Sequence, residues 1–322
     1  MKYITNNHER FPENVLEIQV INVDDNKYIV YPFRFRGLYD LYNYLNSNPK
    51  INYEVWSKNN LASINGEFSF AGDAYEDALK SLLGDVDPGY QEFLKVENKV
   101  NANLGRVHKY EKIRTVAGGH VNVPLYASGS PFIYEASRVI NKPKFITVNI
   151  ALSYFWGTSK SQVFNRAIII TNIVKALEKA GYSVNINAFE LSSESNELFK
   201  MIFEIKHFGE KINYQAMYKS LCRVEFLRRL CFRVLETSDV KEDWEHGYGS
   251  TCGRNFTKKV LKLKKDDLYF DQPREMDIYG RNLVEDFENA ADYLKLSNII
   301  DVEREKNKFK ENVKVLKKNL KN

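Results

Sequence analysis

Side chains that commonly carry catalysis are sparse in this chain and do not form a recognisable constellation. It has five histidines, and none of them has the spacing of a metal-ligating pair. Ser128 lacks the preceding glycine of a nucleophile elbow, and Cys252 lies in no known acyl-transfer motif. An isolated histidine is more often a structural residue than a catalyst. The sequence therefore favours a binding protein over an enzyme.

One polar pair still supports an enzyme hypothesis. His246 lies in a polar and aromatic loop, 239–255, and Asp271 lies near the end of a short strand predicted over 267–273. Ligands of open α/β sheets bind beyond the carboxyl ends of strands, where both residues are expected. We predict His246 and Asp271 as catalytic candidates. Loops of this composition often carry function, so Trp244, His246 and Tyr248 are predicted interaction residues.

A strand–helix–strand unit is the element that must position these side chains. Residues 144–152 are rich in β-branched residues and predict a buried strand. Apolar residues recur at intervals of three or four over 161–180, which predicts a largely buried helix, and 182–189 predicts a second strand. This length suits a βαβ crossover. We therefore predict an α/β fold with a mostly parallel sheet flanked by helices.

A third strand and a long helix are predicted after this unit. The strand covers 198–206, after a polar loop over 192–196, and the helix covers about 213–235. The arginines of the helix spread widely around its axis. They predict a solvated, salt-bridged face with one or two arginines reaching inward, and Arg228 and Arg229 are candidates for binding a partner.

The composition shifts along the chain suggest three regions. Residues 1–140 predict an N-terminal α+β region, 141–280 the α/β core, and 281–322 C-terminal helices with a lysine-rich tail. The N-terminal region includes a predicted hairpin with strands at 15–20 and 28–31. A glycine- and proline-rich segment, 116–131, predicts a second hairpin or clamp leading to the core.

Charge and composition leave two classes of partner open. The chain of 322 residues has a net charge of +5, and aromatic residues make up 13%. Lysine-rich segments at 258–265 and 306–318 could contact phosphates, with aromatic side chains stacking on bases. No apolar run is long enough to span a bilayer, and three cysteines do not make a disulfide framework. We expect a cytoplasmic protein that does not engage membranes.

Several short motifs resemble an uncharacterised family of tailed-phage proteins with a von Willebrand factor A-like (Rossmann-type) core. These motifs are Gly118-Gly119, Val121-Asn122-Val123-Pro124, Ser128-Gly129-Ser130-Pro131, Leu177-Glu178-Lys179-Ala180-Gly181-Tyr182, Leu227-Arg228-Arg229-Leu230-Cys231-Phe232 and Gly247-Tyr248-Gly249. The resemblance extends from about residue 70 to 273. Function in that family is unassigned.

The resemblance allows the metal-binding positions of this chain to be compared with those of von Willebrand A-like proteins. Von Willebrand A-like proteins typically hold a divalent cation with Asp-x-Ser-x-Ser after the first strand, whereas this chain has Asn149, Ala151 and Ser153 at those positions. Without the carboxylate, a hard cation loses its main ligand. The resemblance therefore implies a degenerate metal site at Asn149 and Ser153, no metal and no cofactor. It favours a metal-independent adapter in the host cytoplasm that binds a viral or host protein.

Overall fold

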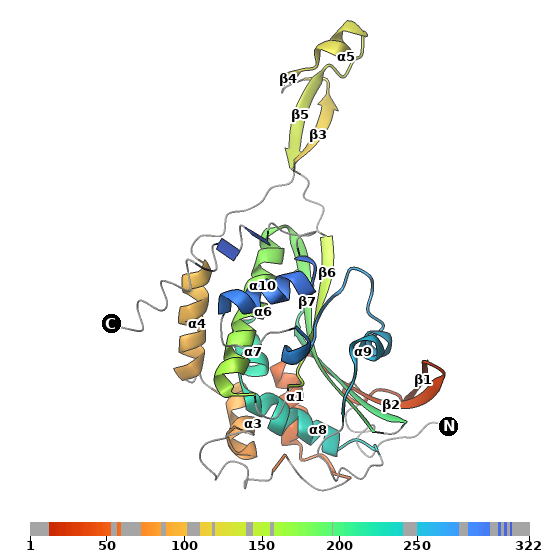
Figure 1. Cartoon of the computed structure of the whole chain (residues 1–322), viewed down its shortest axis with the longest axis vertical. Coiled ribbons are helices and arrows are strands. Elements are labelled where there is room, and N and C mark those ends of the chain that lie inside the picture. Colours follow the sequence, from red (N-terminus) through yellow and green to blue (C-terminus); the bar gives the residue numbers. More distant parts are fainter. Residues whose placement is uncertain are drawn as a thin grey trace.

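The architecture rests on one curled, mixed β-sheet (Figure 1). The structure is a computed structural model that describes residues 13–52, 57–58, 72–84, 88–101, 110–117, 120–139, 144–154, 158–194, 196–240, 250–276, 283–296, 302–303, 306–307 and 310. Six strands follow the order β1-β2-β8-β7-β6-β10, and β9 also pairs with β7. Their bounds are Gln19–Val23 (β1), Asn26–Phe35 (β2), Lys144–Ala151 (β6), Tyr182–Glu194 (β7), Glu197–Lys206 (β8), Ser250–Thr251 (β9) and Leu268–Phe270 (β10).

The strand directions correct the expectation of a mostly parallel sheet. The pairs β10–β6, β6–β7 and β2–β8 are parallel, whereas β1–β2, β7–β8 and β7–β9 are antiparallel. β7 continues to Glu194, beyond the predicted strand, and β8 begins at Glu197. So short a connection can only reverse the chain, because a parallel neighbour needs a crossover of a dozen residues or more.

The predicted strand–helix–strand unit is confirmed as β6, α6 (Lys160–Lys179) and β7. Helix α6 begins with a capping box between Ser159 and Gln162, in which each side chain bonds the backbone N–H of the other residue. It ends before Gly181, whose φ of 88° suits glycine. Residues Ile169, Ile170 and Ile173 are fully buried. The helix therefore lies inside the fold, between the sheet and other helices.

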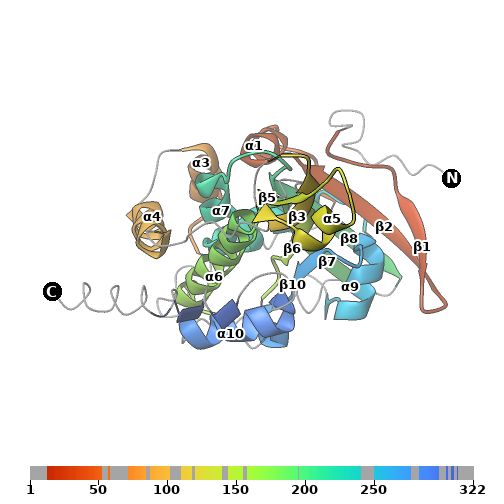
Figure 2. The same cartoon turned by 90° about the horizontal axis from the view of Figure 1, so that it is seen from above.

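Most helices cover one face of the sheet, and α9 (Arg254–Leu261) lies on the other (Figures 1 and 2). The larger hydrophobic core lies between the sheet and the first group of helices, and a smaller one lies beneath α9. Helices of the first group include α1 (Leu38–Asn46), α3 (Tyr75–Leu83), α4 (Pro88–Asn101), α7 (Tyr214–Leu221), α8 (Phe232–Glu236) and α10 (Leu283–Tyr293).

The long helix predicted over 213–235 is instead interrupted. A π-helix, η1 (Phe226–Cys231), lies between α7 and α8. The neighbouring Arg228 and Arg229 of this π-helix bond different parts of the molecule, Arg228 the Tyr154 carbonyl and Arg229 the carbonyls of Ser57 and Asp73. Insertions of this kind are frequent at functional sites.

A separate three-stranded sheet forms an arm that stands away from the body (Figure 1). Its strand order is β3-β5-β4, with antiparallel pairs, and a short helix follows β4. The elements are β3 (Tyr110–Thr115), β4 (His120–Val121), α5 (Val123–Ala127) and β5 (Tyr134–Val139). The glycine- and proline-rich segment therefore does form a hairpin-like structure, although Gly118 and Gly119 lie outside the described residues.

The two ends of the chain contribute differently to this fold. The predicted N-terminal hairpin is present as β1 and β2, but β2 also pairs with β8 and so belongs to the main sheet. At the other end, α10 packs against α6, and the tail beyond residue 310 lies outside the described residues. Among the residues that the structure describes, no helix is both long enough and apolar enough to cross a membrane.

Candidate functional site

Polar side chains gather at the carboxyl ends of the three parallel strands β10, β6 and β7. Ser153 follows β6, Glu190 and Ser192 lie in the second half of β7, and Asp271 follows β10. The carboxyl ends of parallel strands are where α/β sheets bind ligands. A ligand site is therefore expected at this edge of the sheet.

Glu190 is the centre of the first polar group. Its side chain is 4% exposed, and its two carboxylate oxygens accept hydrogen bonds from Ser153 Oγ at 2.8 Å and Ser192 Oγ at 3.1 Å. Burial raises the pKa of Glu190 to about 7, although both serines and Arg228 oppose this rise. A carboxyl that titrates near neutral pH is chemically suited to proton transfer. Because it is enclosed and bonded on both oxygens, it is closed to a substrate in this conformation.

Arg228 links the π-helix to the end of β6. Its Nη2 donates to the Tyr154 carbonyl oxygen at 3.0 Å, and its guanidinium lies over the rings of Tyr154 and Phe232. Burial lowers the pKa of Arg228, while Tyr154 and Glu190 favour the charged form. The positive charge of Arg228 therefore lies within the protein, where it interacts with Glu190, and is not presented on the outer surface.

Asp271 forms a second polar group at the same edge. It is 1% exposed, and its carboxylate accepts hydrogen bonds from the hydroxyls of Tyr269 at 2.9 Å and Tyr293 at 2.7 Å. Arg166 Nη2 donates to the carbonyl oxygens of Asp271 and Ala151, at 3.0 and 2.8 Å. This group joins the ends of β10 and β6 to α6 and α10. Its contacts are those of a structural anchor.

The predicted interaction and catalytic residues of the 239–255 loop precede the short strand β9. Trp244, His246 and Tyr248 lie outside the described residues. The described strand that follows them, β9, pairs with Ser192 and Ser193 of β7, beside the Glu190 group. The pairing of His246 with Asp271 stays a prediction.

Arg229, the other predicted interaction residue, is turned into the protein. It is fully buried, and it donates to the carbonyl oxygens of Ser57 and Asp73, each at 3.0 Å. It therefore cross-links the π-helix to two N-terminal segments and offers no surface to a partner in this structure. Arg233 is buried as well, so the predicted solvated arginine face is largely internal.

The two residues of the degenerate metal site do not meet at a common point. Ser153 Oγ donates to Glu190, whereas Asn149 lies within β6, in register with Tyr269 of β10 and Asn187 of β7. Within the described part of the chain, no group of three or more His, Cys, Asp or Glu side chains could hold a metal ion. Glu190 is not among the residues predicted from the sequence, where its only signal is a single acidic residue between the apolar Phe189 and Leu191.

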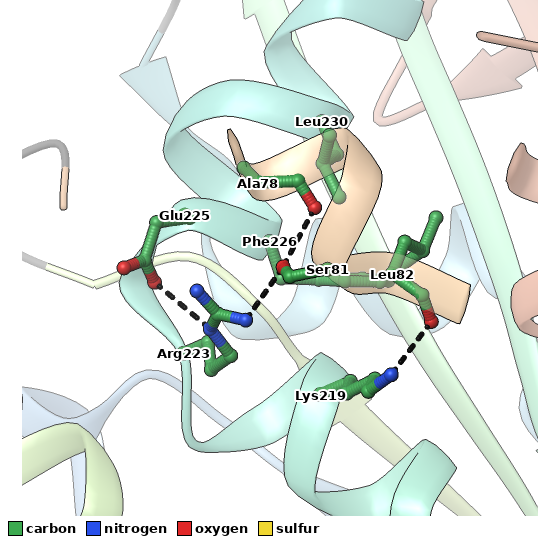
Figure 3. Close-up of a pocket in the computed structure, with 8 residues that line it drawn as sticks. All are labelled: Ala78, Ser81, Leu82, Lys219, Arg223, Glu225, Phe226 and Leu230. Carbon is green, nitrogen blue, oxygen red and sulfur yellow. Dashed lines mark hydrogen bonds and ion pairs between the residues drawn. The ribbon is translucent and has the colours of Figure 1, made fainter. Parts of the chain in front are cut away.

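A small hollow between α3, α7 and the π-helix provides no room for a substrate (Figure 3). Its volume of about 10 Å³ is about the space of one water molecule. Lys219 Nζ donates to the carbonyl oxygens of Leu82 and Gly84, at 3.0 and 2.8 Å, at the end of α3. Arg223 donates to Ser81 Oγ at 2.6 Å. These contacts hold the helices together.

The arm carries a different kind of surface. Large apolar side chains near its tip are 49% to 68% exposed, namely Val116, Val121, Val123, Tyr126 and Phe132. Residues 115–134 contain no Lys, Arg, Asp or Glu, although such residues make up 28% of the chain. The tip is nonetheless ordered by hydrogen bonds, because Asn122 Oδ1 caps α5 and Asn122 Nδ2 bonds Glu135 Oε1 at 2.5 Å. We call residues 115–134 the arm tip.

Comparison with known proteins places the chain in a family without assigning its function. No curated protein and no solved structure gave a significant match. The sequence profile of one family, described as "Domain of unknown function (DUF7192)", matches residues 15–301. That match spans both sides of the sheet and the arm. The chain therefore belongs to the DUF7192 family of domains of unknown function.

Proposed function

We propose that this chain is a metal-independent adapter that binds another protein through the arm tip. The observation that carries the proposal is the exposed, uncharged and apolar arm tip on a sheet that stands away from the body (Figure 1). Soluble proteins rarely leave large apolar patches exposed unless the patches bind something. Aromatic residues such as Tyr126 and Phe132 are enriched at protein interfaces.

The polar groups of the body favour the adapter over the enzyme alternative. Both carboxylates at the sheet edge, Glu190 and Asp271, are enclosed and hydrogen-bonded within the protein. We infer that their hydrogen bonds connect the strand ends in the core that supports the arm. A partner of matching chemistry presents an apolar surface with few charges, because burying an unpaired charge against the arm tip would be costly.

The origin and ancestry of the protein are part of the same proposal. The motif resemblance supports a bacteriophage or prophage protein that acts in the host cytoplasm. The parallel unit β6–α6–β7, with polar residues at its carboxyl end, supports a von Willebrand A-like ancestry of the core. The antiparallel β8 and the terminal β1–β2 hairpin would then be additions to that core.

Affinity capture with matched variants tests the adapter proposal. Wild type is compared with a variant that carries Val123→Ser, Tyr126→Ser and Phe132→Ser at the arm tip. A control variant carries Val20→Ser and Tyr39→Ser, which alter similarly exposed side chains on the body. Extracts of the source cells are treated with nuclease, and bound proteins are identified by mass spectrometry.

The adapter proposal predicts which of the three proteins retain a partner. A protein partner should be retained by wild type and by the control, and it should be lost from the arm-tip variant. Equal recovery by all three proteins would contradict a role for the arm tip. Circular dichroism of each variant verifies that the fold is unchanged.

A further inference from the structure

Helix α9 carries a concentration of positive charge that the adapter proposal does not use. Residues 254–265 contain six basic residues and no acidic one, whereas the whole chain has 47 Lys or Arg and 42 Asp or Glu. The six are Arg254, Lys258, Lys259, Lys262, Lys264 and Lys265. Lys258 is half-buried, and the other five are exposed. The segment is therefore accessible to a partner.

The fold turns a row of these cations away from the sheet. Thr257 and Val260 are the buried residues of α9, and Val260 belongs to the smaller core. Arg254, Lys258 and Lys262 follow one another at intervals of four residues, which places them on one side of the helix, away from Val260. Lys262 is the first residue after the helix, so the row is about 12 Å long at about 1.5 Å per residue. We call Arg254, Lys258 and Lys262 the α9 row.

The charges of the α9 row are not neutralised by ion pairs. Among the residues that the structure describes, no Asp or Glu forms a salt bridge with any of the three. Burial and then Arg254 lower the pKa of Lys258, Asp271 opposes this change, and the exposed Lys295 adds to it. Asp271 is itself buried. The cations around Lys258 are therefore close enough to repel one another.

The α9 row is held in place although its charges repel one another. Like charges at intervals of four residues destabilise a helix. The guanidinium of Arg254 lies over the ring of Tyr293, 4.2 Å from its centroid. Lys200 Nζ donates to the carbonyl oxygen of Val260 at 3.3 Å, and the backbone N–H of Lys262 bonds back into the last turn. An anion that bridges the row would relieve the repulsion at positions that are already fixed.

The chemistry of the α9 row favours nucleic acid over other anionic partners. A helix that docks on an anionic membrane inserts apolar side chains beside its cations, whereas Phe256, Val260 and Leu261 of α9 pack on the smaller core. Protein interfaces are enriched in aromatic residues and depleted of lysine. The row offers only long cationic side chains, which are sufficient to bind phosphates.

Because the α9 row has no aromatic ring, a duplex suits it better than a single strand. Single strands bind largely by stacking their bases on aromatic side chains. Among the described residues, the exposed aromatic rings lie on other elements, namely Tyr39, Tyr126, Phe132, Phe145 and Phe208. A duplex presents one phosphate per about 1.7 Å of its axis, so about seven phosphates lie along the length of the row.

We propose that the α9 row binds the phosphate backbone of double-stranded nucleic acid, irrespective of base sequence. The exposed Lys264 and Lys265 extend the positive surface, whereas Asp24 bonds Lys259 and offsets its charge. Contacts with phosphates carry no sequence information, so duplexes of any composition should bind. Helix α9 lies on the body and not on the arm (Figure 1). This proposal and the adapter proposal can therefore fail independently.

Fluorescence anisotropy with the full chain tests this surface. The probes are fluorescein-labelled A·T-rich and G·C-rich DNA duplexes of about 20 base pairs, several times the length of the row, together with an RNA duplex and a single DNA strand. Affinity is measured from about 50 to about 200 mM salt, a range over which phosphate contacts weaken measurably. Co-sedimentation with vesicles of phosphatidylcholine and phosphatidylserine tests the membrane alternative.

Two double variants of equal net charge are compared with wild type. The row variant carries Lys258→Gln and Lys262→Asn, because asparagine tolerates the left-handed backbone at position 262, where φ is 53°. The control variant carries Lys80→Gln and Lys95→Gln, which remove two exposed cations from α3 and α4 on the other face of the sheet. Lys258→Arg alone keeps the charge of the row.

Wild type should bind both DNA duplexes with similar affinity, and this affinity should fall as salt is raised. The row variant should reduce the slope of log affinity against log salt by about 1.8, because each phosphate contact contributes about 0.9. The control variant and Lys258→Arg should keep the wild-type slope. Binding of either the DNA or the RNA duplex supports the proposal, and their affinities identify the preferred nucleic acid. Absence of duplex binding at about 50 mM salt, tighter binding of the single strand, equal losses of slope in the row and control variants, or binding to vesicles alone would overturn the proposal.

Discussion

Replacing Glu190 by glutamine should change how the stability of the protein depends on pH. The carboxyl has an ordinary pKa of 4.5, and burial raises it to about 7 in the folded protein. Between these values the unfolded chain has released its proton while the folded protein retains it. Stability therefore falls as the pH rises from about 4.5 to about 7. A difference of this size corresponds to roughly 3 kcal/mol, at about 1.4 kcal/mol per pKa unit.

The variant Glu190→Gln keeps a planar polar group between Ser153 and Ser192 but removes the titration. It should match wild type near pH 4.5 and exceed its free energy of unfolding by up to about 3 kcal/mol above pH 7. Urea denaturation at intervals from pH 4.5 to 8.5 measures this difference directly. Comparing the two proteins cancels the titration of all other groups.

A control separates this effect from the loss of any negative charge. Glu92 is exposed on α4, so Glu92→Gln should leave the pH dependence of wild type almost unchanged. The reasoning about Glu190 fails if the stability difference between wild type and Glu190→Gln is the same at pH 4.5 and pH 8.

Three further changes should be visible in the same denaturation assay. Lys175→Met should be more stable than wild type near neutral pH and should lose this advantage towards pH 10. Burial lowers the pKa of Lys175 from 10.5 to about 7, so the stability of wild type rises with pH between these values. Lys219→Met leaves carbonyl groups at the end of α3 without their donor. The free energy of unfolding should fall by about 1–3 kcal/mol. An unchanged free energy of unfolding would show that water replaces the ammonium. Ser159→Ala removes the capping box of α6 and should cost about 1 kcal/mol, while Ser159→Asp should restore most of it.

Local sequence patterns were sufficient to identify the centre of the fold. The strand–helix–strand unit was predictable because β6 and α6 carry long, uninterrupted apolar patterns and Gly181 marks the end of the helix. The N-terminal hairpin was predictable for a similar reason. In each case the information lies within a few adjacent residues.

The sheet pairing and the Glu190 group depend on contacts that are remote in sequence. Residues 192–194 were predicted as a polar loop, yet they form a strand because β8 and β9 supply their hydrogen bonds from both sides. Glu190 is joined to Ser153 from the next strand, and Arg229 to Ser57 and Asp73. A single acidic or basic residue in a sequence predicts an exposed position, because its buried partners lie far away along the chain.

The pairing of β2 with β8 has a consequence for how the chain folds during synthesis. Ile29 pairs with Glu197, so the partner of this early strand is made only after about 170 more residues. At about 5–20 residues per second, the N-terminal hairpin waits roughly 10–30 s on the ribosome with one edge unpaired. Contacts so distant in sequence also slow folding. We therefore expect newly made chains to depend on chaperones until β8 emerges, and a chain truncated before residue 197 should aggregate rather than accumulate as a stable fragment.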